Sequence, residues 1–171
     1  MVLDKKALVA QLEQRLQESA AIAQRAEEEA REAARSMATE SEKKEDGRTV
    51  IEWGSLATGQ AARTRKMRED LKQLSDFCAR GIPDYGPKSP IGLGAVVDVQ
   101  IEGEEGCEER TFILLPVGAG TELTGPGGEG FLSVITPASP VGRALLGKHV
   151  GDTVEVIVRG EAREWTVTAV A

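Results

Sequence analysis

A long stretch near the N-terminus lacks both of the residues that most often interrupt helices. From Asp4 to about Thr39 there is no Gly or Pro, and Ala and Glu are abundant. Apolar or small residues recur in it at helical spacing: Leu8, Leu12, Leu16, Ala20, Ala23, Ala26, Ala30, Ala33 and Met37. The spacing predicts a single helix of roughly 35 residues with one narrow apolar stripe, which makes a rod of about 50 Å.

A second helical pattern runs from about Glu52 to Ala79. Its stripe is thinner and more polar: Leu56, Gly59, Arg63, Met67, Leu71, Leu74 and Cys78. A narrow stripe suits packing against one partner helix better than burial in a globule. With Asp46-Gly47 as the turn signal, residues 1–80 are expected to form an antiparallel two-helix coiled coil.

The turn of this hairpin is an acidic tip around residues 40–53, which crowds acids and bases together and closes on Val50, Ile51 and Trp53. Two interpretations of these apolar side chains are open. They cap the seam by folding over the helix ends, or they dock on the surface of a partner, where an aromatic residue such as Trp53 is a natural anchor.

The composition changes after the second helix. GIPDYGPKSPIG, residues 81–92, is a linker rich in Pro and Gly. Residues 93–171 contain strand-like runs at 95–101, 110–115, 132–136, 154–158 and 164–170, with Arg159-Gly160-Glu161 as a hairpin turn. PVGRALLGK, residues 140–148, favours a short helix. The pattern predicts a small β-rich α+β domain in which this helix covers one face of a strongly bent sheet.

The net charge of −7 is unevenly distributed along the chain. Residues 1–80 hold 15 Lys and Arg against 15 Asp and Glu, whereas residues 81–171 hold 6 against 13. Binding to a nucleic-acid backbone needs a basic surface, so a basic protein surface is the better match for this chain. The N-terminus has no apolar signal region, and there is no run of about 18 apolar residues, so we expect a cytoplasmic protein with no membrane partner.

Two motifs that carry chemistry in other chains have simpler explanations here. GRALLGK, residues 142–148, has phosphate-loop spacing, but His149 stands where Ser or Thr is needed. The segment favours a helix whose Leu145 and Leu146 pack on the sheet and whose Gly147 caps the end. His149, the only histidine, is expected in a surface turn.

Three other segments are assigned no catalytic role. GAGTELTGPGGEG, residues 118–130, is expected to be a mobile surface loop. Cys78 and Cys107 are expected to be plain thiols. ARTRKMR, residues 62–68, is explained most simply as a solvated helix face, with contact to phosphate or RNA as the alternative.

The stretch ITPASPVGRALLGKHVGDTVEV, residues 135–156, resembles the signature of the Gre transcript cleavage factors. Their C-terminal domain carries a Ser-Pro-aliphatic-small-Arg-Ala-Leu-aliphatic-Gly-Lys segment and then a Gly-Asp turn, here Ser139 to Lys148 and Gly151-Asp152. The resemblance implies an α+β chain in which an N-terminal antiparallel two-helix coiled coil is followed by a linker and an FKBP-like β-rich domain.

The resemblance also implies a mode of action on bacterial RNA polymerase. The globular domain would sit on the rim of the secondary channel and grip a coiled coil of the largest subunit through the surface around Ser139, Pro140 and Arg143. The helical hairpin would enter the channel, where its tip would help hold the second catalytic Mg²⁺ so that the polymerase cuts its own backtracked RNA.

On this reading the chain is not an enzyme by itself. It has no cofactor of its own, because the Mg²⁺ is held mainly by the polymerase, and it meets DNA only through the polymerase. Arg63, Arg65 and Lys66 would then be candidates for contact near the RNA 3′ end.

The tip departs from the family pattern, which has an Asp and, three residues on, a Glu. Asp46 matches the Asp, but Thr49 stands in place of the Glu. Asp46 and Glu45 are the expected pair that reaches the metal, with Glu42 third, and Glu52 is a further source of the missing carboxylate. Because Mg²⁺ prefers octahedral oxygen ligands and keeps several waters, one or two carboxylates can complete a site that the polymerase already holds.

Several functions therefore stay open. One is stimulation of RNA cleavage, and another is regulation of initiation or elongation without cleavage, which the altered acidic pair favours. An FKBP-type peptidyl-prolyl isomerase or chaperone would need an aromatic-lined pocket, yet beyond the linker the second half offers only Phe112, Phe131 and Trp165. A coiled-coil adaptor outside transcription is the remaining alternative.

Overall fold

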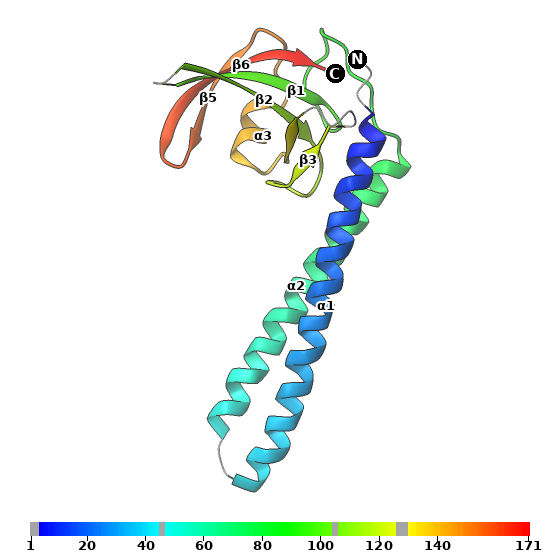
Figure 1. Cartoon of the computed structure of the whole chain (residues 1–171), viewed down its shortest axis with the longest axis vertical. Coiled ribbons are helices and arrows are strands. Elements are labelled where there is room, and N and C mark those ends of the chain that lie inside the picture. Colours follow the sequence, from blue (N-terminus) through cyan, green and yellow to red (C-terminus); the bar gives the residue numbers. More distant parts are fainter. Residues whose placement is uncertain (1–3, 45–46, 104–105, 126–129) are drawn as a thin grey trace. The chain divides into compact units, whose positions relative to one another are not determined.

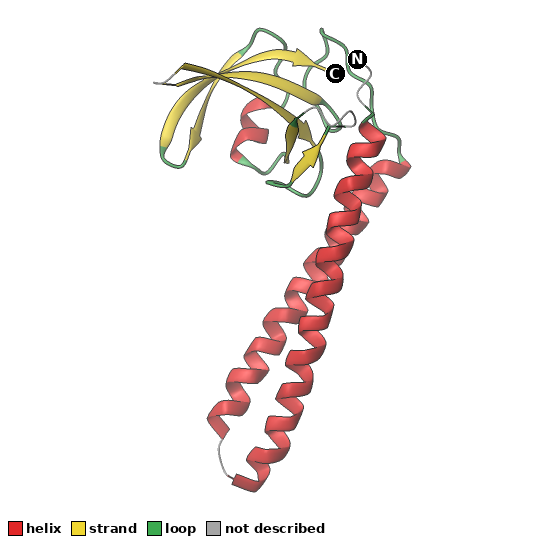
Figure 2. Cartoon of the chain, in the orientation of Figure 1, coloured by secondary structure: helices red, strands yellow, loops and turns green. Residues whose placement is uncertain are grey.

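The computed structural model describes residues 4–44, 47–103, 106–125 and 130–171. Two long helices come first, and a β-sheet with one short helix follows (Figures 1 and 2). The elements are α1 (Lys5–Lys44), α2 (Gly47–Ala79), β1 (Val96–Gly103), β2 (Gly106–Leu114), β3 (Glu122–Thr124), β4 (Phe131–Ile135), α3 (Pro140–Leu145), β5 (Thr153–Val158) and β6 (Glu161–Val170). The predicted α+β class, a helical hairpin followed by a β-rich domain, is confirmed, whereas the FKBP-like character stays a prediction.

Both long helices extend further into the tip than the pattern predicted. α1 continues to Lys44, and α2 begins at Gly47 instead of near Glu52, so the run up to Trp53 is helical. Nothing after Gly47 breaks a helix, because neither Gly nor Pro occurs again before Gly54. At the other end, the Asp4 carboxylate accepts hydrogen bonds from the backbone N–H groups of Lys6 and Ala7 and so caps α1.

The chain divides into two compact units, one comprising Met1–Glu13 with Gln73–Ala171 and the other Gln14–Lys72. The predicted boundaries at 80 and 92 followed the change in composition. In the structure the N-terminal end of α1 and the C-terminal end of α2 belong to the unit that contains the sheet. Gln11 explains part of this, because its side-chain amide exchanges hydrogen bonds with the backbone of Thr124 in β3.

Leu12 also packs within the unit that holds the sheet. Its side chain lies so close to Gly118 that a Cβ there would come within 2.7 Å of it. Lys5 donates a hydrogen bond to the Pro83 carbonyl, and its ammonium lies 5.1 Å from the centre of the Tyr85 ring. Burial lowers the pKa of Lys5, although the charge of Asp84 acts in the opposite direction.

Within the unit Gln14–Lys72, the seam between the helices is formed by small residues. Ala23, Ala30 and Thr64 are almost completely buried. The predicted stripe is wrong at three positions of α2, because Leu56 is 46% exposed and Gly59 and Arg63 are also exposed. In place of these three, the seam contains Thr64 together with Trp53, Ala57, Gln60 and Ala61. Met67 and Leu71 of the predicted stripe are half-buried, as expected. Thr64 can be buried because its hydroxyl donates to the Gln60 carbonyl one turn earlier.

The sheet has six strands in the order β3-β4-β2-β1-β6-β5. β2 and β4 run parallel, and all the other neighbours run antiparallel. The predicted hairpin turn is present between β5 and β6, where Val158 pairs with Glu161 and both Arg159 and Gly160 have positive φ. This is the two-residue connection that suits the twist of antiparallel strands.

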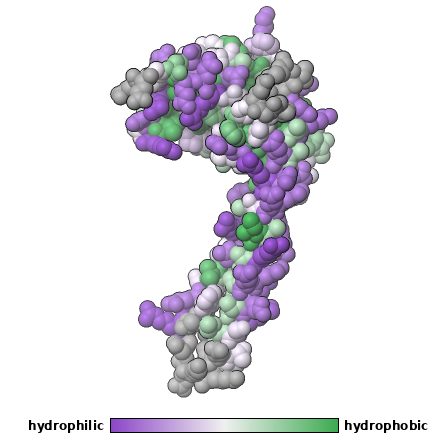
Figure 3. Space-filling view, viewed as in Figure 1, coloured by the Kyte–Doolittle hydropathy of each residue, from purple (hydrophilic) through white to green (hydrophobic). Residues whose placement is uncertain are grey.

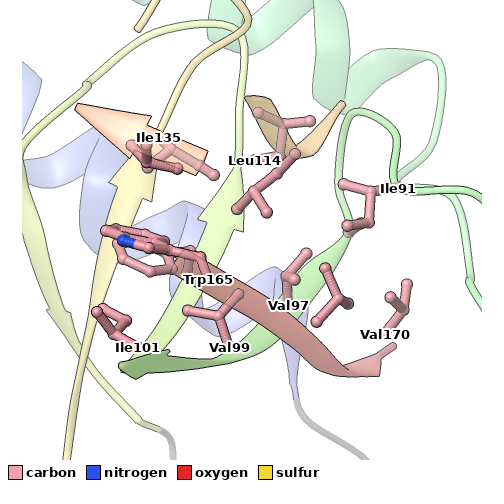
Figure 4. Packing of buried hydrophobic residues seen from close by; sticks show 13 residues of the cluster. Ile91, Val97, Val99, Ile101, Leu114, Ile135, Trp165 and Val170 are labelled. Carbon is pink, nitrogen blue, oxygen red and sulfur yellow. The ribbon is translucent and has the colours of Figure 1, made fainter. Parts of the chain in front are cut away.

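One face of the sheet carries a hydrophobic core, and α3 lies against it (Figure 1). Trp165 of β6 stacks on Phe112 of β2, with ring centroids 5.5 Å apart. Figure 4 shows Trp165 among apolar side chains from several strands and the linker. The cluster comprises Ile91, Ala95, Val97, Val99, Ile101, Phe112, Leu114, Ile135, Leu145, Val156, Trp165, Val167 and Val170. A short helix covering one face of the sheet was predicted correctly.

Two predictions about this domain are wrong in detail. The segment 118–130 contains strand β3, which pairs with β4 and whose Leu123 is completely buried. Leu146 does not pack on the sheet but is 44% exposed, since it is the residue that ends α3. Leu145 is buried as expected, and Gly147 follows with a φ of 78°, the left-handed conformation in which helices commonly end.

A substitution at Gly142 tests how closely α3 packs against the backbone at Thr136. A Cβ at this position would clash with the Thr136 carbonyl oxygen, which is backbone and cannot move aside. We expect Gly142→Ala to lower the free energy of unfolding by roughly 2–3 kcal/mol. Gly54→Ala is the control, because nothing lies within 4 Å of that Cβ and α2 would gain helix propensity. Chemical denaturation measures both, and a Gly142→Ala variant as stable as the parent would contradict this packing.

Candidate functional site

The carboxylates expected to reach a metal lie at the end of the hairpin. Asp46 and Glu45 fall outside the described residues. Glu42 belongs to α1, but its side chain is also outside them. The pairing of these acids therefore stays a prediction, and the described neighbours must be considered by themselves.

Glu52, the further candidate carboxylate, is on the exposed side of α2. Its Oε1 lies 3.8 Å from Nε of Arg48, one turn earlier, and the two side chains are 70% and 91% exposed. Such an exposed pair contributes little to stability. Ile51 is 74% exposed on the same turn. An acid, a base and an apolar side chain are thus all presented to solvent here.

Trp53 lies between the two helices instead of pointing freely outward. It is half-buried and lines a cavity of about 310 Å³. The other lining residues are Ala26, Glu29, Ala30, Ala33, Leu56 and Gln60. This position fits the interpretation that Trp53 caps the seam, while the exposed Ile51 is the better placed of the two to meet a partner.

Gln60 introduces a polar atom into this part of the seam that the sequence gave no reason to expect. Its side-chain oxygen is buried and has no hydrogen-bond partner within the described part of the chain. A buried acceptor without a donor destabilises the fold by about 1–3 kcal/mol.

Figure 3 shows that the surface of the hairpin mixes hydrophilic with hydrophobic side chains.

The basic cluster on α2 is divided by its contacts. Arg63 and Arg65 are exposed. Lys66 forms an ion pair with Asp70 at 2.6 Å, and this hydrogen bond, followed by the carboxylate charge, raises the pKa of Lys66. Arg63 and Arg65 are therefore better placed than Lys66 to contact phosphate.

Ser139 caps the short helix α3. Its hydroxyl donates to the Thr136 carbonyl at 2.8 Å and accepts from the backbone N–H groups of Gly142 and Thr136 at 3.1 and 3.2 Å. Pro140 follows at the first turn, where its fixed φ suits a helix start. The Ser-Pro pair thus has a structural role, since it sets where α3 begins.

Two exposed residues of α3 and two that follow it make up what we call the α3 surface: Pro140 and Arg143 in the helix, Leu146 at its end and Val150 in the turn beyond. Leu146 and Val150 are 44% and 39% exposed, so two large apolar side chains reach solvent here. An arginine beside exposed aliphatic groups is a common composition for a protein-binding patch. Of these residues, the sequence pointed to Pro140 and Arg143 but missed Leu146 and Val150.

The segment 142–148 has no phosphate-loop geometry. Gly142 to Leu145 lie in α3, where Arg143 N–H donates to the Ser139 carbonyl and Leu146 N–H to that of Gly142. His149 is exposed in a turn, as predicted, and its backbone N–H donates to the Asp152 carboxylate. The expectation that this motif binds no nucleotide agrees with the helix found here.

Within residues 4–44, 47–103, 106–125 and 130–171, no three His, Cys, Asp or Glu side chains gather closely enough to hold a metal ion. Cys78 and Cys107 are free thiols, and burial, followed by the charge of Glu13, raises the pKa of Cys78. Among the helices described, none has the length and apolar character needed to cross a membrane.

Comparison with known proteins gives a consistent set of relatives. A family model described as "Transcription elongation factor, GreA/GreB, C-term" matches residues 86–171. Transcription elongation factor GreA of Rhodospirillum rubrum is 32% identical over 115 residues, which are 64% of this chain and 67% of that protein.

Three solved structures also align with the chain at low similarity. GreA factor homolog 1 of Thermus thermophilus has 22% identity and a TM-score of 0.36, covering 93% of this chain and 94% of that one. Thermus aquaticus Gfh1 has 24% identity and a TM-score of 0.38, covering 92% of each. The GreA/GreB factor of Nitrosomonas europaea has 24% identity and a TM-score of 0.35, covering 54% and 65%. Because these TM-scores are low, the three alignments provide no support for the fold of this chain.

The unpaired Gln60 side chain leads to a stability prediction. Gln60→Leu removes the buried acceptor and adds apolar volume beside the cavity, so we expect the free energy of unfolding to rise by about 1 kcal/mol. Gln24→Leu is the matched control, because Gln24 is exposed on α1 and donates to Glu28. Thermal unfolding followed at a helix-sensitive wavelength measures both, and a loss of stability in Gln60→Leu would show that the oxygen has a partner.

Proposed function

Because the chain belongs to the GreA/GreB family of transcription elongation factors, we propose that it binds RNA polymerase at the secondary channel and stimulates cleavage of backtracked RNA. It acts as an accessory factor, in the cytoplasm where the polymerase works, and the catalytic metal belongs to the polymerase. The observation that carries the proposal is the pair of long helices α1 and α2, which follow one another in the chain with two residues between them.

The hairpin has the dimensions for this task. α1 contains 40 residues and α2 contains 33. At 1.5 Å per residue these helices are about 60 and 50 Å long. Helices of this length can present carboxylates at a distance that no side chain projecting from the β-domain could reach.

The chemistry needs only one or two of these carboxylates. Mg²⁺ binds oxygen ligands octahedrally and keeps several of its waters, so a metal held by the polymerase can accept further ligands from a partner. A pair of metal ions then stabilises the attacking and leaving oxygens of RNA hydrolysis. In this proposal Asp46 and Glu45 approach the second metal, and Glu42 is the third candidate.

Docking requires a second contact, which we assign to the α3 surface. Pro140 and Arg143 are exposed beside Leu146 and Val150, and Ser139 holds the helix that carries them. A coiled coil of the largest polymerase subunit offers a complementary helical surface. The exposed Arg63 and Arg65 supply positive charge on the hairpin near the 3′ end of the nascent RNA.

A second function for the same architecture is regulation of initiation or elongation without RNA cleavage. Thr49 stands where the family pattern has its glutamate. Arg48 and Glu52 also lie within ion-pair distance at this turn, so the nearest described carboxylate has a basic neighbour. A hairpin of this composition could occupy the channel and limit access of nucleotides without binding metal.

One assay separates the two functions. Added to backtracked elongation complexes, the chain is expected to release short RNA fragments from the 3′ end. Asp46→Ala should slow this release at least about ten-fold, the effect of losing roughly 1.4 kcal/mol of transition-state stabilisation, with binding to polymerase unchanged. Glu32→Ala, an exposed acid on α1 away from the tip, is the control. Binding without any fragment release would refute the cleavage function and leave the regulatory one.

Docking is tested independently of cleavage. Leu146→Asp places a charge on the α3 surface at an exposed position, so the domain should fold normally while the Kd for polymerase rises at least about ten-fold. Ala119→Asp adds the same charge at an exposed position before β3 and serves as the control. Binding is measured by fluorescence anisotropy, and equal affinities of the two variants would show that the α3 surface is not part of the interface.

A further inference from the structure

The strand at one end of the sheet has a free edge. β5 (Thr153–Val158) is the last strand in the sheet order and pairs with β6. Among the strands that the structure describes, no other lies beside it. Its second edge is therefore available to hydrogen-bond an added strand.

The backbone groups that face this edge can be identified. The Val167 N–H donates to the Asp152 carbonyl at 2.9 Å just before β5 begins. In an antiparallel pair, residues bonded to the partner strand alternate with residues that are not. Val154, Val156 and Val158 therefore bond to β6, whereas Thr153, Glu155 and Ile157 direct their N–H and C=O groups toward the free edge.

The edge has little protection against pairing with another chain. Such strands are commonly protected by charged side chains, above all Lys, by Pro or by a bulge, and the one charged residue of β5 is Glu155. β5 has the sequence TVEVIV and a continuous register with β6 from Thr153 to Val158. Ile157 is 63% exposed and Val158 is 37% exposed, so apolar surface accompanies the unpaired backbone.

The face that carries Ile157 is acidic. Glu155 lies directly opposite Glu164, and Ile157 lies opposite Ala162. Like charges placed opposite each other destabilise a sheet by roughly 0.2–1 kcal/mol, so this pair does not serve the fold. The neighbouring strands add Asp98, Glu102 and Glu109 on the same face.

Within the described strands, no basic residue shares the face of these carboxylates; Arg159 lies in the turn that joins β5 to β6. The described residues of β1, β2, β5 and β6 include two arginines, Arg110 and Arg163. Both lie on the opposite face, where Arg110 pairs with Glu108 at 2.7 Å and Arg163 with Glu161 at 2.8 Å. The acidic face therefore complements a cationic partner.

We propose that the edge of β5 binds an extended segment of another protein in which Lys or Arg alternates with aliphatic residues. The segment adds a strand to the sheet through the backbone groups of Thr153, Glu155 and Ile157. Alternate residues of a strand share a face, so the basic side chains lie on the face of Glu155, Ile157 and Glu164, where their methylene stems cover Ile157. The aliphatic side chains lie on the face of Val154 and Val156. A second copy of this chain is a poorer occupant, because it would bring like charges together and each chain already carries a net charge of −7.

α3 contacts β5, so this edge lies near the helix that carries part of the α3 surface. The proposal uses the unpaired backbone groups of β5 instead of that surface, so it goes beyond polymerase docking and is tested without polymerase. The probe is a synthetic peptide of about eight residues that alternates Lys and Val, long enough to span β5. Added to the full chain labelled with ¹⁵N, it should shift and protect the amides of Thr153, Glu155 and Ile157 first. Increasing salt should weaken the binding, since exposed charges are screened.

Two controls distinguish strand addition from attraction to an acidic protein in general. The same peptide with alternate backbone nitrogens methylated keeps every charge but cannot form the ladder, and we expect its Kd to be at least about ten-fold higher. Ile157→Lys should weaken binding of the unmodified peptide by at least about ten-fold, because it protects the edge and repels the lysines. Glu122→Lys, on the edge strand β3, should have no such effect.

Several outcomes would overturn the proposal. Equal binding of the methylated and unmodified peptides would mean that backbone pairing plays no part. Shifts confined to other elements, or binding unchanged by Ile157→Lys, would place the peptide elsewhere. Self-association of the chain that Ile157→Lys abolishes would make a second copy the occupant. Circular dichroism of each variant checks that the sheet is intact.

Discussion

The narrow seam between α1 and α2 is the constraint on which the rest of the account depends. Its buried positions within the unit Gln14–Lys72 are mostly small, such as Ala23, Ala30 and Thr64, so little apolar surface holds the helices together there. Strong helix propensity compensates, because α1 has no Gly or Pro anywhere. The result is a pair of long helices whose surfaces are mostly polar, with Ile22, Ile51 and Leu56 as exposed apolar exceptions. A hairpin of this kind is suited to entering a channel in another protein rather than to burial in a core of its own.

In the unit that contains the sheet, the Ser139 hydroxyl both stabilises the start of α3 and lies beside the residues proposed for docking. The Ser139 hydroxyl donates one hydrogen bond and accepts two from the backbone of Thr136 and Gly142, so its hydrogen-bonding capacity is occupied within its own turn. A partner would meet its neighbours on the α3 surface instead. The Ser-Pro pair of the motif thus sets where α3 begins, next to the residues that we propose for docking.

The sequence predicted the elements whose signal is local. The helical periodicity of α1 and the alternating pattern of β1 and β6 each lie within one segment, and both were found. Strand β3 was missed because it has three residues and depends on pairing with β4, which no local pattern reveals. The exposure of Leu146 could have been inferred, since Val141 and Leu145 are four residues apart on one helix face and Leu146 falls off it. The seam of α2 was misplaced because Leu56 is larger than Thr64, and burial of Thr64 depends on its hydrogen bond to Gln60.

The central claim is that the hairpin carries its acidic tip to the active-site metal of RNA polymerase. The most direct measurement replaces the catalytic Mg²⁺ of the polymerase with Fe²⁺ and generates hydroxyl radicals at that metal in the complex. These radicals act only near their source, so the account predicts that the chain is cut within the tip, around residues 40–53, and is left intact in the β-domain. Cuts confined to the β-domain, or no cuts in a complex shown to be assembled, would contradict it.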